Sequence, residues 1–229
     1  MTEFYVFFVS LQQKQDMDKA NFSSAYRKEL RTKIREVAMQ HFLAKGIRAV
    51  KMDDIANALS ISKRTLYELY DNKEDLLLEV LKEAEESRHN RISAFAERVD
   101  NNVMEIIFEL YRMHAEAYDN VNPLFYQELK KYPKVTNYLD EKDTVDENLT
   151  QAFFNLGIEQ GYFRKEIDFA IVAKMMRECV RYAIYNTDFT TVKFDYLFTN
   201  VIFLFFRGFC TDKGIEAVNR MFDKDHSQG

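Results

Sequence analysis

Residues that interrupt regular secondary structure are scarce in this chain, which has only 6 glycines and 2 prolines among 229 residues. Strands joined by tight turns require such residues, so a fold built from β-strands is disfavoured. Apolar residues recur at helical spacing along most of the chain, and an apolar content of 47% is ample for a large core. The sequence therefore predicts an all-α protein.

Motifs that carry catalysis are absent from the sequence as well. The chain has no glycine-rich phosphate-binding loop, no Gly-x-Ser-x-Gly, no His-Glu-x-x-His and no Cys-x-x-Cys. Its two cysteines, Cys179 and Cys210, stand alone in apolar segments, as buried side chains of a protein in the reducing cytosol do. We therefore expect a cytoplasmic protein that is not an enzyme, with no cofactor and no metal.

A strongly apolar segment, FDYLFTNVIFLFFRGF at residues 194–209, raises the question of a membrane span. A span needs about 20 apolar residues, and Asp195, Asn200 and Arg207 interrupt this segment, so we expect no membrane partner. A helix that is apolar on nearly every side must be enclosed by protein. With the preceding helix it can form a four-helix interface between two subunits, or part of the core of one subunit. The candidate interface residues are Met176, Val180, Ile184, Leu197, Val201 and Leu204.

Charge is distributed unevenly along the chain. The whole chain holds 32 basic and 37 acidic side chains, but residues 27–73 hold 11 basic against 6 acidic, and the remainder holds 21 against 31. A basic segment is thus joined to an acidic body, as expected when one end of a protein meets a polyanion. A group of cations in this segment either follows a phosphate backbone or is merely solvated: Arg27, Lys28, Arg31, Lys33 and Arg35.

The segment DDIANALSISKRTLYELYDNKEDL at residues 53–76 has the pattern of a helix-turn-helix that opens into a third helix. Apolar residues fall where two short crossing helices must share a core, namely Ile55, Leu59, Ile61, Leu66 and Leu69, and Ala56 is small where the helices approach most closely. The second helix shows a face suited to phosphates and base edges, made of Ser62, Lys63, Arg64, Thr65 and Tyr67. The alternative is an ordinary amphipathic hairpin whose basic face is solvated.

The ends of these predicted helices carry their own signals. Ser62 is the expected N-cap of the second helix, and Asn72 with Asp75 forms a capping-box-like start for the third. Lys73 then lies at a helix N-terminus, where a phosphate is a natural ligand. The turn carries Ser60 where a positive φ would favour glycine, so Ser60 must adopt that conformation or the turn takes another geometry.

These residues resemble the tetracycline-repressor (TetR) family of bacterial transcriptional regulators over about residues 30–80. The chain retains the following residues of the family pattern: Phe42, Gly46, Asp54, Ile55, Ala56, Ser62, Thr65, Leu66, Tyr67, Lys73, Glu74 and Leu76. It departs from the pattern where Val50-Lys51 replaces a threonine pair and Arg64 replaces the glycine of the recognition helix. Lys51 can still meet a phosphate, and Arg64 adds a bidentate donor that should change the preferred operator. The DNA-binding candidates are therefore Lys51, Ser62, Lys63, Arg64, Thr65, Tyr67 and Lys73.

The resemblance implies a DNA-binding domain at residues 25–76 and an effector-binding and dimerisation domain at residues 77–229, joined by a continuous helix. Further helices are predicted at 102–119, 123–131, 135–160, 168–186 and 192–211. In this family such a bundle holds a small effector, here one of apolar or aromatic character. The candidate pocket residues are Phe108, Tyr111, His114, Tyr118, Phe125, Tyr126, Phe153, Tyr162 and Tyr182, and each of them can instead be a core residue.

Residues 1–24 form an N-terminal extension. An apolar run at residues 4–9 lacks the basic flank and the cleavage site of a signal peptide. We hypothesise that residues 1–16 arise from an upstream start codon.

The sequence as a whole predicts a homodimeric regulator that represses transcription on a roughly palindromic operator and is released by an effector. One alternative is a scaffold of the same family whose C-terminal bundle binds a protein partner. Another is a ligand-binding protein that no longer binds DNA.

Overall fold

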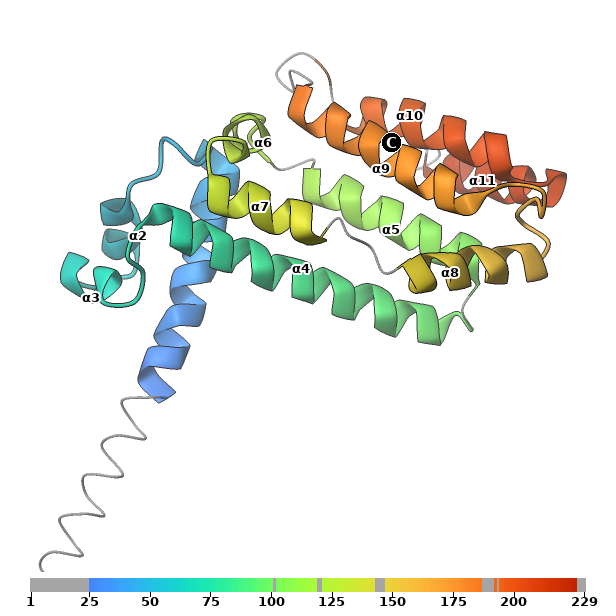
Figure 1. Cartoon of the computed structure of the whole chain (residues 1–229). Coiled ribbons are helices and arrows are strands. Elements are labelled where there is room, and N and C mark those ends of the chain that lie inside the picture. The colour runs from blue at the N-terminus through green and yellow to red at the C-terminus, as the bar shows by residue number, and fades with distance from the viewer. Residues whose placement is uncertain are drawn as a thin grey trace, which may run out of the picture.

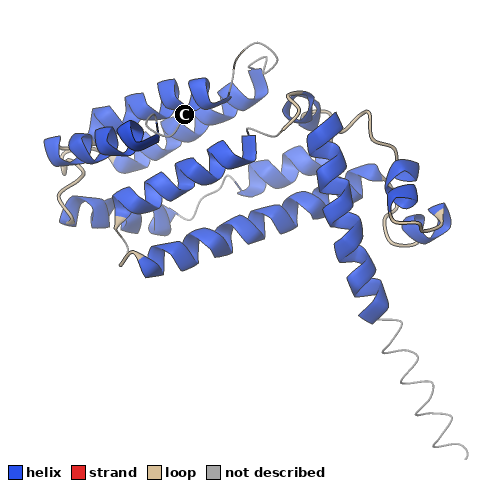
Figure 2. Ribbon diagram, turned by 180° about the vertical axis from the view of Figure 1, so that it is seen from behind, coloured by secondary structure: helices blue, strands red, loops and turns tan. Residues whose placement is uncertain are grey.

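The computed structural model describes residues 25–100, 102–118, 121–142, 147–186, 192 and 194–225. Within these ranges the protein consists of helices and their connections, with no strand (Figure 2). The predicted all-α fold is therefore confirmed, while the predicted extension at residues 1–24 lies outside the described ranges. In the same ranges, no helix combines the length and the apolar character that crossing a membrane requires.

The N-terminal part contains a helix at residues 25–45, then α2 (Met52–Ala58), α3 (Lys63–Tyr67) and α4 (Lys73–Arg98). The two short helices α2 and α3 lie at one end of the molecule, and α4 runs from there along the rest of it (Figure 1). As predicted, one helix continues without a break past residue 77. Helix α4 therefore joins the N-terminal and C-terminal parts directly.

The C-terminal part contains α5 (Val103–Tyr118), α6 (Leu124–Leu129), α7 (Pro133–Lys142), α8 (Glu147–Glu159), α9 (Phe169–Asn186), α10 (Phe194–Phe209) and α11 (Asp212–Asp225). The single helix predicted at 135–160 is wrong, because α7 packs on α4 whereas α8 packs on α5 and α9. Helix α11 was not predicted. It follows α10 closely, since the Thr211 hydroxyl accepts a hydrogen bond from the backbone N–H of Gly214 at 3.2 Å and caps its start.

One hydrophobic core joins the N-terminal helices to α6 and α7. Its fully buried members include Phe42, Ile55, Leu66, Leu76 and Leu77. Phe125 and Leu129 of α6 and Val135 of α7 belong to the same core. The N-terminal helices therefore share one packed interior with part of the C-terminal domain, although the sequence predicted a boundary at residues 76 and 77.

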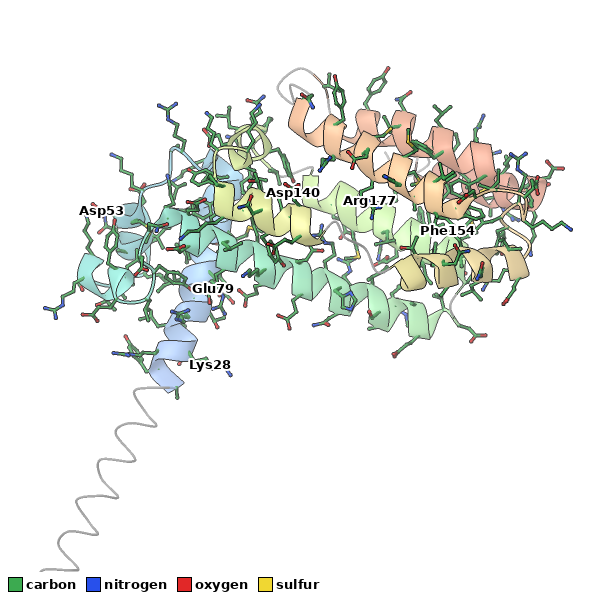
Figure 3. The ribbon with its side chains drawn as sticks, in the orientation of Figure 1. Lys28, Asp53, Glu79, Asp140, Phe154 and Arg177 are labelled. Atoms are coloured by element: carbon green, nitrogen blue, oxygen red, sulfur yellow. The ribbon has the colours of Figure 1, made fainter. Side chains whose placement is uncertain are left out.

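A second core, at the other end of the molecule, is built largely from phenylalanine rings. Phe154 of α8 packs with Phe163, Phe169 and Phe209 at centroid separations of 4.3–5.9 Å, and Figure 3 marks Phe154 in this region. Cys210 is buried in this core, and burial raises the pKa of its thiol to about 12. The prediction of a buried cysteine is confirmed for Cys210, while Cys179 is half-buried.

Gly157 of α8 lies in close contact with the second core. A Cβ atom at this position would lie 2.0 Å from the ring of Phe163. We expect Gly157→Ala to lower the free energy of unfolding by about 1–3 kcal/mol, because the buried ring cannot move away without a cavity or a strained rotamer elsewhere. Urea unfolding followed by circular dichroism measures this.

The double variant Gly157→Ala/Phe163→Leu provides the control for that measurement. Removal of the ring should relieve the clash with the alanine. Gly157→Ala should therefore lower the free energy of unfolding by less in the Phe163→Leu background than in the wild type. Equal effects in the two backgrounds would show that the contact with Phe163 does not cause the loss of stability.

Candidate nucleic-acid interface

The turn between α2 and α3 is held by backbone hydrogen bonds and by one residue in the left-handed region. Ser60 has a φ of +54°, so of the two alternatives left open by the sequence, Ser60 adopts the positive φ although it is not glycine. The backbone N–H of Ile61 donates to the carbonyl of Ala56 at 3.0 Å, which satisfies the end of α2. Ile55 and Leu66 are fully buried across this turn, and the predicted shared core of the two helices is confirmed.

The starts of α3 and α4 are capped as the sequence predicts. The Ser62 hydroxyl accepts from the backbone N–H of Thr65 at 3.0 Å, and the two hydroxyls bond each other at 2.8 Å. At the start of α4, the Asn72 side chain accepts from the backbone N–H of Asp75 at 3.0 Å. These bonds fix α3 as a short, well-defined helix between two turns.

The outward face of α3 presents cations and a phenol to solvent. Lys63, Arg64 and Tyr67 are exposed, while Leu66 on the opposite side is fully buried. Lys63 Nζ lies 2.8 Å from a carboxylate oxygen of Asp53 on α2, and this partner raises the pKa of the lysine. Figure 3 shows Asp53 at the same end of the molecule. Arg64 Nε donates to Glu68 at 2.9 Å. The arrangement is a basic face with attached acids, supported by a buried apolar side.

Lys73 does not share this exposed face, although the sequence placed it among the DNA-binding candidates. Its ammonium donates to the carbonyls of Ile47, Arg48 and Val50 at 2.8, 3.3 and 2.9 Å. Burial lowers the pKa of Lys73, and the negative charges of Glu128 and Asp54 oppose that shift. All three ammonium hydrogens are directed at the loop before α2, so the side chain holds that loop and its donors are not open to a phosphate. Lys51, by contrast, is exposed directly before α2.

Some basic residues of the 25–45 helix are paired with acids, and others are exposed near its start. Arg31 donates to Glu79 at 3.0 Å and to the carbonyl of Leu69 at 2.9 Å, and Arg35 donates to Glu83 at 2.5 Å. These arginines bind the helix to α4 and to the end of α3, as the position of Glu79 in Figure 3 illustrates. Lys33 pairs within its own helix with Glu29 at 2.6 Å. Arg27 and Lys28 are exposed near the start of the helix, so these two remain available to a phosphate backbone.

Helix α6 is fastened to the loop that carries α2. Glu128 is buried, and its carboxylate accepts from the backbone N–H of Arg48 at 2.6 Å. The backbone N–H of Asn122 donates to the carbonyl of Leu43 at 2.7 Å. Gly46, with a φ of +81°, lets α6 approach, because a Cβ there would lie 3.1 Å from Leu124. Glu128 has no local signal in the sequence, because its role depends on a contact across 80 positions of the chain.

The structure does not bring the nine predicted pocket residues together. Phe125 and Tyr126 pack into the first core, near α2 and α3, whereas Phe153 and Tyr162 pack into the second. Tyr182 is 70% exposed. Phe108 and Tyr111 stack along α5 with centroids 6.5 Å apart, and the side chains of His114 and Tyr118 lie outside the described part. Long-range packing thus assigns several of these aromatic residues to separate cores.

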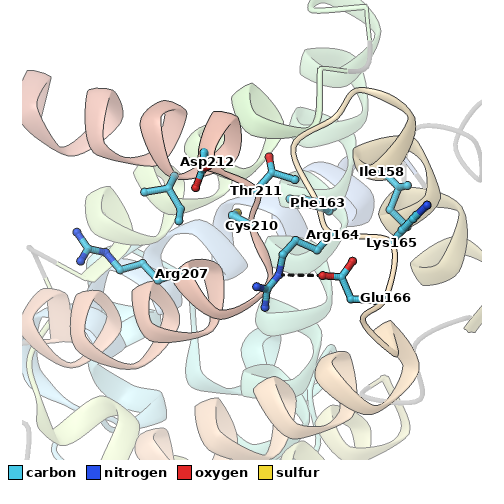
Figure 4. A pocket seen from close by; sticks show the side chains of 10 residues that line it. Ile158, Phe163, Arg164, Lys165, Glu166, Arg207, Cys210, Thr211 and Asp212 are labelled. Atoms are coloured by element: carbon cyan, nitrogen blue, oxygen red, sulfur yellow. Dashed lines mark ion pairs between the residues drawn. The ribbon is translucent and has the colours of Figure 1, made fainter.

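An open depression of about 560 Å³ lies where the loop after α8 meets α10 and α11 (Figure 4). Charged residues line much of it, and Arg164 pairs there with Glu166 at 3.7 Å. None of the nine predicted pocket residues contributes to its lining. It therefore differs in place and in character from the apolar pocket that the sequence predicts.

Large apolar side chains are left exposed on α9 and α10, which pack side by side (Figure 1). Leu204, one of the predicted interface residues, is 72% exposed. Met176 is partly buried in the second core, Val201 is half-buried, and the side chains of Val180, Ile184 and Leu197 lie outside the description. Further exposed residues of the same helices were not predicted as interface residues, namely Ile171, Met175 and Tyr196. Their helical spacing to Tyr182 and Leu204 is the signal that could have indicated them.

Comparison with known proteins agrees with the geometry of the helix-turn-helix. Residues 34–80 match the family described as bacterial regulatory proteins, tetR family. These residues contain the end of the first helix, all of α2 and α3, and the start of α4. The helix-turn-helix of this chain is thus that of a TetR-family transcriptional regulator. Members of that family are not enzymes, and they bind operator DNA and small-molecule effectors.

Individual relatives extend the similarity beyond the helix-turn-helix. The HTH-type transcriptional repressor KstR2 of Mycobacterium tuberculosis is 26% identical over 156 residues, which cover 65% of this chain and 76% of the relative. The fatty acid degradation regulator FadR of Bacillus halodurans has a similar fold, with a TM-score of 0.59 and 22% identity over 77% of this chain and 94% of that one. A transcriptional regulator from Saccharomonospora viridis gives a TM-score of 0.58 at 19% identity, over 80% and 99% of the two chains.

The different roles of Lys73, which holds a loop, and Lys63, which is exposed, can be tested by measuring the stability of two variants. We expect Lys73→Met to lower the free energy of unfolding by about 1–3 kcal/mol, because three carbonyls lose their donor. Lys63→Met, at an exposed position, should change it by less than about 0.5 kcal/mol. Chemical denaturation of both variants measures the difference. If Lys73→Met leaves stability unchanged and weakens DNA binding as Lys63→Met does, the assignment of Lys73 to the loop is wrong.

Proposed function

We propose that the protein is a homodimeric transcriptional repressor that binds a roughly palindromic operator through α3 and is released by a small effector. The observation that carries the proposal is the two-sided character of α3, with Leu66 buried and Lys63, Arg64 and Tyr67 exposed on one short helix. Such a helix can enter the major groove without losing its own core contacts. Repression, rather than activation, is supported by the name of the 26% identical relative, a transcriptional repressor.

The contacts we assign to DNA come from three places on one end of the molecule. Lys63, Arg64 and Tyr67 would meet phosphates and base edges from α3, and Lys51 would meet a phosphate before α2. Ser62 and Thr65 hold each other and the helix start, so they act on the orientation of α3 and contribute at most one free hydroxyl hydrogen. Arg27 and Lys28 would extend the phosphate contacts along the 25–45 helix.

Dimerisation is supported by the exposed apolar residues of α9 and α10. Leu204, Ile171 and Tyr196 are exposed on two helices that pack side by side, and apolar residues grouped on a surface mark interaction sites. A dimer has a functional purpose, because two recognition helices separated by about 34 Å meet successive major grooves on one side of the duplex.

The effector would act on α5, which carries Phe108 and Tyr111 and contacts α4, α8, α10 and α11. A buried carboxylate links α5 to α4, since Glu109 accepts from Arg91 of α4 at 2.9 Å and from Arg112 at 2.6 Å. An apolar ligand that moves α5 would therefore move α4 as well. Because coupling is reciprocal, DNA must weaken effector binding by the same factor by which the effector weakens DNA binding.

DNA binding is tested by fluorescence anisotropy on duplex DNA from upstream of the protein's own gene, at several salt concentrations. We expect the affinity of the wild type to fall steeply with salt, because phosphate contacts release counterions. Lys63→Ala/Arg64→Ala should weaken binding by about tenfold or more. The matched control is Lys165→Ala/Lys174→Ala, which removes the same charge from the C-terminal domain and should change the affinity by less than about twofold. Equal losses of affinity in both double variants would contradict the assignment of α3 as the recognition helix.

The dimer is tested by sedimentation velocity. We expect Leu204→Glu to convert a wild-type dimer into a monomer, since a buried, unpaired carboxylate at an apolar interface is strongly unfavourable. Tyr26→Glu is the control, because this aromatic residue is also exposed but lies on the 25–45 helix. A wild type that sediments as a monomer, or a Leu204→Glu variant that stays dimeric, would contradict an interface formed by α9 and α10.

A further inference from the structure

Arg64 is the most open cation on the recognition helix. Its side chain is 90% exposed, and within the described residues its only polar contact is the bond from Nε to Glu68 Oε1 at 2.9 Å. The two terminal nitrogens, Nη1 and Nη2, are therefore without a protein partner in that part of the chain. These two nitrogens form the planar fork that can donate two parallel hydrogen bonds to one acceptor pair.

Glu68 occupies a position that fixes how this fork points. It is the C-cap residue of α3, one helical turn after Arg64, and its backbone N–H donates to the Arg64 carbonyl at 2.9 Å. Its carboxylate holds Nε, the inner edge of the guanidinium, and leaves the outer edge free. An arginine held in this way loses less side-chain freedom when it binds than a fully mobile one does.

Lys63 and Arg64 are adjacent on α3 but suited to different acceptors. Lys63 is a point charge that pairs with Asp53 across to α2 and lies 6.0 Å from the ring centroid of Tyr67. A single ammonium of this kind suits phosphate, whose oxygens impose little orientation. The forked guanidinium of Arg64 instead matches the O6 and N7 acceptors that guanine presents in the major groove.

We infer that Arg64 reads a guanine in each operator half-site and that Glu68 is its positioning residue. The inference rests on the proposed function, because it requires α3 to lie in the major groove, and it adds the base that α3 recognises. Neighbouring acids would ordinarily weaken DNA binding by repelling phosphate. Glu68 is expected to have that effect on every sequence and, in addition, to raise the preference for the guanine.

The first test selects binders from a duplex library with 24 random base pairs, using the full chain as wild type and as Arg64→Lys. The lysine variant keeps the charge and loses the fork. We expect the wild type to select a symmetric motif with one guanine per half-site that the variant no longer prefers, while the other positions of the motif persist. If Arg64→Lys selects the same guanine with the same strength, the inference is wrong although the proposed function stands. If the wild type selects no motif, the proposed function fails and the inference with it.

The second test replaces that guanine in the selected duplex by 7-deazaguanine, which lacks the N7 acceptor. We expect wild-type affinity to fall about tenfold and Arg64→Lys affinity to change by less than about twofold. Equal losses in the two proteins would overturn the assignment of the fork to this base.

The role of Glu68 is tested by Glu68→Ala, with Asp71→Ala as the matched control. Asp71 is an exposed acid three residues further along, so its removal changes the same charge without touching Arg64. Both variants should bind an unrelated duplex more tightly than the wild type, because one repelling charge is gone. Only Glu68→Ala should lose guanine discrimination, measured as the affinity ratio between the selected duplex and its 7-deazaguanine form. If the ratio falls equally in both variants, or in neither, Glu68 does not position Arg64 for the guanine.

Discussion

The recognition helix depends on the burial of Leu66. A helix of five residues cannot be stable alone, because the cost of starting a helix exceeds what one turn of hydrogen bonds returns. Leu66 anchors α3 in a core that also holds Phe42 and Ile55, while Ser62 caps its start and Arg31 takes the Leu69 carbonyl just beyond its end. The exposed cations can face DNA only because the opposite side of the helix is fixed in this way.

The local features of the helix-turn-helix could be predicted from the sequence, because they depend on residues close together in the chain. The caps at Ser62 and Asn72 follow from neighbours within three positions. For the turn at Ser60 the sequence left two geometries open, and the positive φ is the one that occurs. The role of Lys73 could not be predicted, since its acceptors lie 23 to 26 positions away in a loop that carries no signal for them.

The C-terminal domain was predicted less completely for the same physical reason. Helical periodicity shows that an aromatic residue faces protein, but not which core it enters, so Phe125 and Phe153 looked alike in sequence and belong to different cores. The end of α7 at Lys142 was missed because residues 134–156 contain no glycine or proline that would mark it. Packing separates the two helices, because α7 lies on α4 whereas α8 lies on α5 and α9.

The shared core also bears on how an effector signal can reach α3. Phe125, Leu129 and Val135 are packed with the N-terminal helices, and Glu128 binds the loop before α2, so a movement of α4 alone would break a buried core. Among the residues of α4, Leu76, Leu77 and Val80 are buried in it, and the later part of the helix buries no residue as deeply. The N-terminal helices, α6 and α7 should therefore move as one body. Bending is then expected in α4 beyond Val80, where the Arg91–Glu109 pair connects it to α5, and a ligand needs to strain only that connection to turn the recognition helix.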